Sequence, residues 1–263
     1  VDTDYYNEGQ DLSPVKALVP GNNALWVFKE PSQANTTVFY HTPSPTHVNE
    51  ILVNVYPCQH SSITTGCVST GINFNDDIVF FSERGMEGIT GDVTTEQVIA
   101  HRSTLVDPKM TNEVNYKNML LQEWEGYLLV IIDNKIYLAD SRCLYTNQNH
   151  NEYEWFYWEL DFNVQSAVVK NGVLYLCSTA KNGKSYIYTL TKMNSNIESY
   201  WTTCFDGCGY PQMQKITNKR GCTIDMTGEK VKLEIRADKD EFEEIDTFIN
   251  TKDYVVPRIK KKK

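Results

Sequence analysis

Four copies of one local pattern recur along the first two thirds of the chain: a polar turn followed by a short segment of branched and aromatic residues. They begin at residues 22, 76, 125 and 171, so their spacing is 46 to 54 residues. A period of about 40 to 50 residues is typical of the four-stranded blades of a β-propeller. The copies are Asn22–Phe28, Asp76–Phe81, Glu125–Ile131 and Asn171–Leu176. We therefore predict an all-β fold, with a β-propeller-like array of short antiparallel hairpins in residues 1–205.

Each copy is followed by a second apolar segment that can close a hairpin with it. The turns Asp133-Asn134 and Asn182-Gly183 tolerate the positive φ angles that tight hairpins require. Because one hairpin buries only one of its faces, several must stack to form a core. Further strands are expected at Leu52–Tyr56 and at Trp155–Leu160, whose aromatic side chains can fill space between sheets. The closing segments are Thr37–Tyr40, Met86–Ile89, Lys135–Leu138 and Tyr186–Leu190.

One stretch departs from this pattern. Residues 92–115 predict a helical insertion, because Thr94–His101 resembles a helix and Thr94 with Gln97 can form a capping box. The Asp107-Pro108 pair would stop or turn that segment, since proline disfavours helical geometry in the residue before it.

The sequence pattern changes a second time after Gly207–Pro211, a segment that is rich in turn residues. We place a domain boundary near residue 205 and expect residues 206–263 to form a partial C-terminal β module. Within it, Lys230–Arg236 alternates charged and apolar residues, as an antiparallel strand with one face in water does.

Composition and charge limit the fold classes and the partners that can be expected. The excess of aromatic residues (16 Tyr, 10 Phe and 5 Trp) favours sheet. A net charge of −9 would repel phosphate backbones, so nucleic acid is not an expected partner. We interpret Lys260–Lys263 as a solvated end or as the point where a longer chain was cut, rather than as a nucleic-acid patch or a membrane anchor. The sequence has no apolar run of about 18 residues, so we expect no membrane partner.

The seven cysteines are odd in number and irregularly spaced, so they do not predict a disulfide framework. A reducing compartment such as bacterial cytoplasm is the simpler interpretation. Cys204 and Cys208, with Cys222 further on, leave two interpretations open: a structural zinc site or free thiols. No fourth ligand is obvious, which favours free thiols.

Catalytic motifs are not evident. The five histidines do not follow metal-binding spacings, and His101 is interpreted as a surface or packing residue rather than a base. Asp76-Asp77, near Glu83, predicts a turn rather than a calcium loop or a catalytic carboxylate pair. We therefore expect no catalytic residue, no metal and no cofactor, and predict that the protein is not an enzyme.

Aromatic and basic residues around the expected boundary are the candidate contact residues. Tyr and Trp side chains anchor interfaces and stack on sugars, although packing at a domain junction is the alternative. The candidates for contact with a partner protein or a glycan are Tyr200, Trp201, Tyr210, Lys219 and Arg220.

Several segments are distinctive in combination. They are Arg102–Val106 with Asn112-Glu113, Glu123–Leu128, Ala139–Arg142 with Tyr153–Trp158, and Ile197–Thr203 with Gly209–Pro211 and Thr217–Gly221. Across roughly residues 60 to 260, the chain thereby resembles large uncharacterised phage and prophage proteins of Gram-positive gut bacteria (Firmicutes), which are encoded among tail genes.

This resemblance implies a structural or adaptor component of a virion tail, made in the host cytoplasm and assembled with other tail proteins and with copies of itself. It also implies that the chain continues beyond Lys260–Lys263 and that Cys204 and Cys208 are incidental. It supplies no catalytic residues. Two other functions stay open: binding of a host-surface carbohydrate, and a propeller-type glycoside hydrolase, which would need converging arginines or paired carboxylates.

Overall fold

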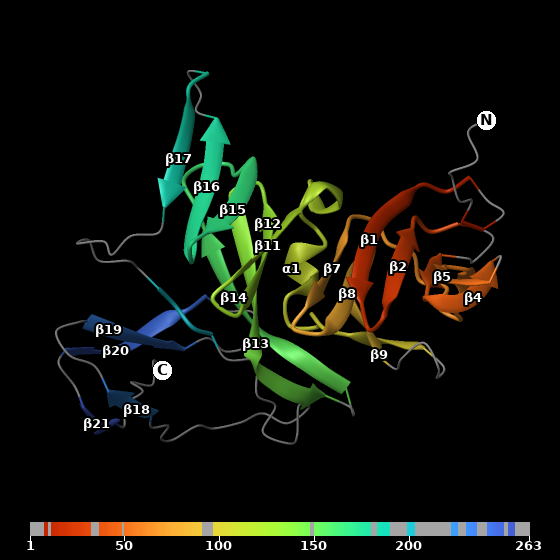
Figure 1. Ribbon diagram of the computed structural model, residues 1–263. Helices are drawn as coiled ribbons and strands as arrows, with labels where there is room; N and C mark the ends of the chain where they lie inside the picture. Colours follow the sequence, from red (N-terminus) through yellow and green to blue (C-terminus); the bar gives the residue numbers. More distant parts are fainter. Residues whose placement is uncertain are drawn as a thin grey trace. The chain divides into compact units, whose positions relative to one another are not determined.

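The computed structural model is mostly β, as the sequence predicts, and its sheets are antiparallel (Figure 1). It divides into two compact units, residues 1–194 and 195–263, whereas the sequence places the boundary near residue 205. The structure describes residues 8–9, 12–32, 37–48, 50–90, 97–147, 150–179, 183–189, 199–202, 222–225, 230–235, 241–249 and 252–255.

Unit 1 contains four sheets that follow one another along the chain. Sheet 1 consists of β1 (Val15–Gly21), β2 (Ala24–Lys29), β3 (Val38–His41) and β6 (Cys58–His60). Sheet 2 consists of β7 (Gly71–Phe74), β8 (Asp77–Ser82), β9 (Gly85–Thr90) and β10 (Val98–His101). Sheet 3 consists of β11 (Leu120–Trp124), β12 (Tyr127–Ile132), β13 (Lys135–Asn147) and β14 (His150–Glu159). Sheet 4 consists of β15 (Ser166–Lys170), β16 (Val173–Thr179) and β17 (Ser185–Thr189).

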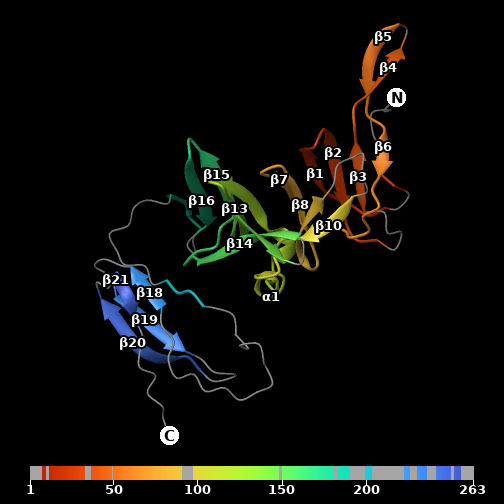
Figure 2. The same ribbon diagram turned by 90° about the horizontal axis from the view of Figure 1, so that it is seen from below.

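The strands of each sheet pair in chain order, and a separate hairpin interrupts sheet 1. That hairpin consists of β4 (Ser44–Val48) and β5 (Ile51–Val55), lies in the chain between β3 and β6, and projects from the sheet (Figure 2). The predicted strand at Leu52–Tyr56 is thereby confirmed, except that it ends at Val55.

The four sequence copies are confirmed as the second strands of the four sheets, each entered through the same kind of turn. The two central turn residues both have positive φ, which is the signature of a type I′ turn and which Asn, Asp and Gly adopt at low cost. In the second copy the turn lies one residue earlier than predicted. The turn pairs are Asn22-Asn23, Asn75-Asp76, Glu125-Gly126 and Asn171-Gly172.

The closing segments are confirmed as the third strands β3, β9, β13 and β17. In the predicted Asp133-Asn134 turn, Asp133 has a φ of 55°, and Gly183 in the other predicted turn has a φ of 74°. Asn182 lies outside the described residues.

Neighbouring sheets pack face to face, and β8 shows why its sequence is a continuous apolar run. Side chains alternate between the faces of a strand, so Ile78 and Phe80 pack toward sheet 1 while Val79 and Phe81 pack toward sheet 3. Phe80 stacks on Phe28 of sheet 1, with 4.8 Å between ring centroids. A strand covered on both faces needs apolar residues at every position, which is the pattern that the repeats carry.

Strand β12 repeats this arrangement one sheet further on. Leu128 and Val130 belong to the core shared with sheet 2, whereas Leu129 and Ile131 belong to the core shared with sheet 4. The aromatic strand β14 fills the same two spaces, because Trp155 and Tyr157 pack on the first core and Trp158 packs on the second. This confirms the role that the sequence predicts for it.

The predicted helix at Thr94–His101 is wrong over its described part. Residues Val98–His101 form β10, which pairs with β9 and completes sheet 2. Pairing along an exposed sheet edge outweighs the weak local helix preference of so short a segment. Thr94, one half of the expected capping box, lies outside the described residues.

The helical residues of this stretch come later than predicted. A short helix, α1 (Asp107–Met110), is followed by a 3₁₀ turn, η1 (Tyr116–Asn118). Pro108 lies in the first turn of α1 and so begins the helix rather than ending one, because a missing N–H costs nothing at that position.

Unit 2 contains two described two-stranded sheets. Strand β18 (Cys222–Asp225) pairs with β21 (Lys252–Val255), and β19 (Lys230–Ile235) pairs with β20 (Glu243–Ile249), both antiparallel. The alternating segment at Lys230–Arg236 is therefore confirmed as an antiparallel strand up to Ile235. No closed barrel or propeller occurs among the described residues of either unit.

Candidate functional site

The predicted contact residues fall in unit 2, and only two of them are described. Tyr200 is 81% exposed and Trp201 is 87% exposed, so both rings are available to a partner. Tyr210, Lys219 and Arg220 lie outside the described residues, as do Cys204 and Cys208.

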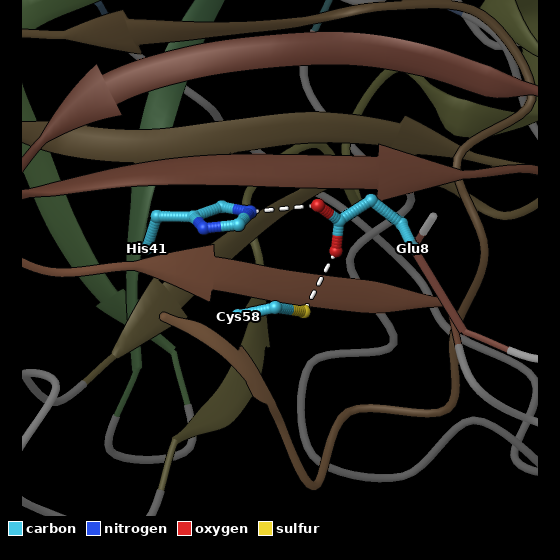
Figure 3. A group of neighbouring side chains, drawn as sticks. All are labelled: Glu8, His41 and Cys58. Atoms are coloured by element: carbon cyan, nitrogen blue, oxygen red, sulfur yellow. Dashed lines mark hydrogen bonds and ion pairs between the residues drawn. The ribbon is translucent and has the colours of Figure 1, made fainter. Parts of the chain in front are cut away.

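A cluster that the sequence analysis misses lies on sheet 1: Glu8, His41 and Cys58, named here the Glu8 cluster (Figure 3). The His41 Nε2 atom lies 2.7 Å from Glu8 Oε1, and the Cys58 thiol donates a hydrogen bond of 2.8 Å to Glu8 Oε2. One carboxylate thus connects an imidazole and a thiol. All three side chains can bind a metal ion, and their potential ligand atoms lie within 4.8 Å of one another. Within the described part of the chain, no other such group of three is found.

Strand pairing brings the imidazole and the thiol together. His41 ends β3 and pairs directly with Cys58, the first residue of β6, so both side chains point to the same face. That face is the one opposite Trp26 and Tyr40, which form part of the core shared with sheet 2. The chain reaches the pairing only after the β4–β5 hairpin.

The N-terminal segment supplies the third side chain. The Lys29 ammonium donates a 2.7 Å hydrogen bond to the main-chain carbonyl of Glu8, which fixes that residue over the outer face of sheet 1. The side chains of Glu8 and His41 are both largely buried, whereas Cys58 is exposed. The cluster therefore has a protected side and an open side.

Hydrogen bonding sets the protonation of His41. Its Nδ1 lies 2.9 Å from the carbonyl oxygen of Tyr56, and because a carbonyl only accepts, Nδ1 carries a proton. Burial alone would lower the pKa of His41, but the hydrogen bonds to Tyr56 and Glu8 and the charge of Glu8 outweigh it and raise the pKa. The raised pKa favours the protonated ring, in which Nδ1 donates to Tyr56 and Nε2 to Glu8.

Cys58 is held as a neutral thiol. Desolvation of its sulfur, and then the hydrogen bond to Glu8 and its negative charge, raise the pKa of Cys58 to about 12. Because the thiolate is the nucleophilic form, a thiol with this pKa is a poor nucleophile at neutral pH. The arrangement therefore does not activate Cys58 for covalent catalysis.

Spacing alone could not reveal the Glu8 cluster. Its members are separated by 33 and 17 residues, which match no short metal-binding motif. The cluster could be predicted only by knowing that β3 pairs with β6 across the inserted β4–β5 hairpin. That pairing is known only once the sheet itself is known.

A second polar cluster lies at sheet 2 and consists of Glu87, His101, Ser103 and Asp107, named here the His101 cluster. His101 Nδ1 lies 3.2 Å from Glu87 Oε2, and its Nε2 contacts the carboxylate of Asp107. Ser103 donates a 2.5 Å hydrogen bond to Asp107 and accepts one of 2.7 Å from the N–H of Met86. The cluster joins β9, β10 and α1.

The His101 cluster pairs one imidazolium with two carboxylates. The Asp107 and Glu87 carboxylates raise the pKa of His101 to about 9, against the opposing effect of burial, so the imidazole is a cation at neutral pH. Burial alone would raise the pKa of Glu87, but His101 and Arg84 lower it. From the sequence, His101 is expected on a helix as a surface or packing residue. In the structure it lies on β10, where it is the cation that pairs with two carboxylates.

An ion pair also lies between sheets 2 and 3. The Arg102 guanidinium donates a 2.8 Å hydrogen bond to Asp77, which accepts another of 2.9 Å from the Tyr153 hydroxyl. Gly88 leaves room for the guanidinium, because a Cβ there would lie 2.7 Å from Arg102 Nε. Asp76 lies in the predicted turn, while Asp77 is a structural partner of Arg102.

Comparison with known proteins finds no family model and no curated sequence that matches the chain. Among the described residues, no helix has the length and apolar character needed to cross a membrane.

Proposed function

We propose that this chain is a propeller-like structural or adaptor module of a phage or prophage tail, and that it acts by binding other proteins of the particle. The tail assignment rests on the sequence resemblance. The observation that carries the adaptor function is the projecting β4–β5 hairpin, whose strand β5 and the residue after it expose apolar side chains. These side chains are Ile51, Leu52, Val55 and Tyr56.

An exposed apolar arm is unusual on a monomer and typical of a surface that a partner covers. The arginines of unit 1 also favour a binding protein, because Arg84, Arg102 and Arg142 each pair with a different nearby carboxylate. A glycosidase would need such groups to converge on a substrate. We therefore propose that the chain is a binding protein rather than an enzyme.

The propeller-like arrangement is proposed from the contacts between sheets. The first strands of consecutive sheets lie together in two cases, β1 with β7 and β11 with β15. First strands that adjoin in this way are what a propeller places around its axis. Sheet 4 exposes Val168, Val173 and Ile187 on the face turned away from sheet 3, where a further blade would pack.

Substitution in the hairpin tests the adaptor function. We expect Ile51→Asp with Leu52→Asp to leave the fold intact and to abolish incorporation of the chain into particles, measured by immunogold labelling of purified virions. Val114→Asp is the control, since Val114 is an even more exposed apolar residue outside the hairpin. Undiminished labelling with the hairpin variant, or labels found only on non-virion material, would overturn the proposal.

A second candidate function is binding of a host-surface glycan, which the exposed rings of Tyr200 and Trp201 favour. A glycan array probed with the wild-type chain and with Trp201→Ala tests it. Binding that the substitution removes supports this function, and an array without any binder excludes it.

A further inference from the structure

We propose that Glu8, His41 and Cys58 form a binding site for a zinc-type divalent cation, which joins the N-terminal segment to sheet 1. This inference goes beyond the proposed adaptor function and does not depend on it. It starts from three ligand atoms of different chemistry whose mutual separations are all within 4.8 Å.

The donor set selects the class of cation. Imidazole nitrogen, thiolate sulfur and carboxylate oxygen are the three ligand types that Zn²⁺ uses in proteins, at distances of about 2.0 to 2.3 Å. An ion at such distances from three ligands needs ligand atoms about 3 to 4 Å apart. This is slightly more than the hydrogen-bond separations of 2.7 and 2.8 Å and less than the 4.8 Å that bounds the cluster. Magnesium and calcium prefer oxygen ligands alone, so the sulfur of Cys58 disfavours them.

The orientation of His41 is already that of a metal ligand. Zinc-bound histidines usually donate the proton of the other ring nitrogen to a carbonyl or carboxylate, which fixes the tautomer. In His41 this donor is Nδ1 and its acceptor is the Tyr56 carbonyl at 2.9 Å, so Nε2 is the nitrogen aimed at Glu8 and Cys58. The carbonyl holds the ring in place whether or not an ion is bound.

Binding is an exchange of protons for the ion. In the metal-free cluster, the Nε2 proton of His41 and the thiol proton of Cys58 are both donated to the Glu8 carboxylate. The cation displaces these two protons to solvent and forms bonds to the nitrogen, the sulfur and one carboxylate oxygen. No electron is transferred, and the ligand atoms need only move apart from their hydrogen-bond separations of 2.7 and 2.8 Å.

The site is open on one side. Cys58 is exposed, and a pocket lined by Gly21, Leu25, Pro43 and Tyr56 adjoins His41. Three protein ligands with a fourth position open to water or to another ligand is an arrangement that tetrahedral zinc sites adopt. Since Glu8 belongs to the N-terminal segment and the other two ligands to sheet 1, the ion would cross-link the two.

Cobalt titration tests the proposal, because Co²⁺ replaces Zn²⁺ and reports its ligands by absorbance. The chain of residues 1–263 carrying Cys204→Ser and Cys208→Ser is used, so that those thiols do not contribute. We expect a sulfur-to-cobalt charge-transfer band and visible bands of tetrahedral intensity, both abolished by one equivalent of Zn²⁺.

Single substitutions in that background identify the ligands. Cys58→Ser should remove the charge-transfer band, and His41→Gln and Glu8→Gln should each weaken Zn²⁺ binding more than about tenfold in competition with a chromogenic chelator. The matched controls are His60→Gln, which lies on the same strand as Cys58, and Cys177→Ser; both should bind as the parent does. Circular dichroism of each variant, compared with the parent, shows that the fold is retained.

Two outcomes would overturn the proposal. One is a parent chain that shows no sulfur-to-cobalt band. The other is a band that survives Cys58→Ser or disappears with Cys177→Ser, because the ion would then bind elsewhere. Loss of virion incorporation in the hairpin variant has no bearing on either outcome, so the two proposals fail separately.

Discussion

The two polar clusters of unit 1 place a histidine beside carboxylates, yet their surroundings differ. In the His101 cluster both ring nitrogens face carboxylates, those of Glu87 and Asp107, so the imidazolium is the charge that the cluster requires. In the Glu8 cluster one ring nitrogen faces a neutral carbonyl and the other shares a carboxylate with a thiol. The first histidine neutralises two anions, whereas protons on the second can be replaced by a metal ion.

The two clusters also differ in how far their side chains are buried. The Glu87 side chain is 2% exposed and cannot be left without a cation, since a buried unpaired charge is strongly destabilising. Cys58 is an exposed residue, so water can compensate in part for the loss of its hydrogen bond. Two carboxylates on one histidine therefore favour a structural role for the His101 cluster, and a single carboxylate shared with a thiol favours ion binding at the Glu8 cluster.

The largest expected effect is on the His101 cluster. His101→Gln should lower the free energy of unfolding by about 3 kcal/mol, because Asp107 loses its cation and the buried Glu87 keeps only the largely exposed Arg84. Urea unfolding followed by tryptophan fluorescence measures it. The control His47→Gln removes an exposed histidine on the β4–β5 hairpin and should change the stability by less than about 0.5 kcal/mol. Equal stabilities of the two variants would contradict the structural role of His101.

Metal addition should produce the next largest effect. Zinc at a concentration of 100 times the dissociation constant should raise the free energy of unfolding by about 2.7 kcal/mol, provided that only the folded state binds it. Thermal unfolding of the Cys204→Ser, Cys208→Ser chain, with zinc and with excess chelator, measures this effect. Adding Cys58→Ser should abolish it, and adding Cys177→Ser should preserve it; stabilisation of the Cys58 variant would place the ion elsewhere.

The pH dependence of stability is expected to separate the clusters further. The pKa of His101 is about 9 in the folded chain and near 6.5 when unfolded, so its contribution is full below pH 6.5 and is lost as the pH rises through 9. The stability difference between wild type and His101→Gln should therefore shrink by on the order of 1 kcal/mol over that range. Denaturant titrations at both pH values measure it. A difference that grows with pH would show that the sign is wrong.

The smallest effect is expected for Cys58→Ser without metal. Serine can donate the same hydrogen bond to Glu8, and the site is open to water, so the free energy of unfolding should change by about 0.5 kcal/mol. Unfolding in the presence of a chelator measures it. A loss as large as that of His101→Gln would mean that the Glu8 cluster is itself structural.

Much of unit 1 could be predicted because its signals are local. A turn pair such as Asn171-Gly172 and the apolar run after it act within a few residues, so they mark the second strand of a sheet wherever it packs. The error at Val98–His101 has the opposite cause. This edge strand has a sequence that is compatible with a helix, and only the neighbouring strand β9 decides its conformation.

The sites depended on contacts that local sequence does not encode. His101 acquires its charge from Glu87 and Asp107, which lie 14 and 6 residues away in the chain. His41 meets Cys58 only because β3 and β6 pair across an inserted hairpin. Residue type showed which side chains could bind a cation or accept a proton, and folding decided which of them meet.

The predominance of strands, the four repeated turns and the apolar strands that follow them were predictable from the amino-acid order, because turn chemistry and the alternation of side chains act over short distances. Two features could be known only from the folded chain: a segment with a helix-like sequence forms an edge strand, and His41 and Cys58 share the Glu8 carboxylate. Strand pairing and charge neutralisation join residues that are distant in the chain, so their energies appear only when the chain has folded.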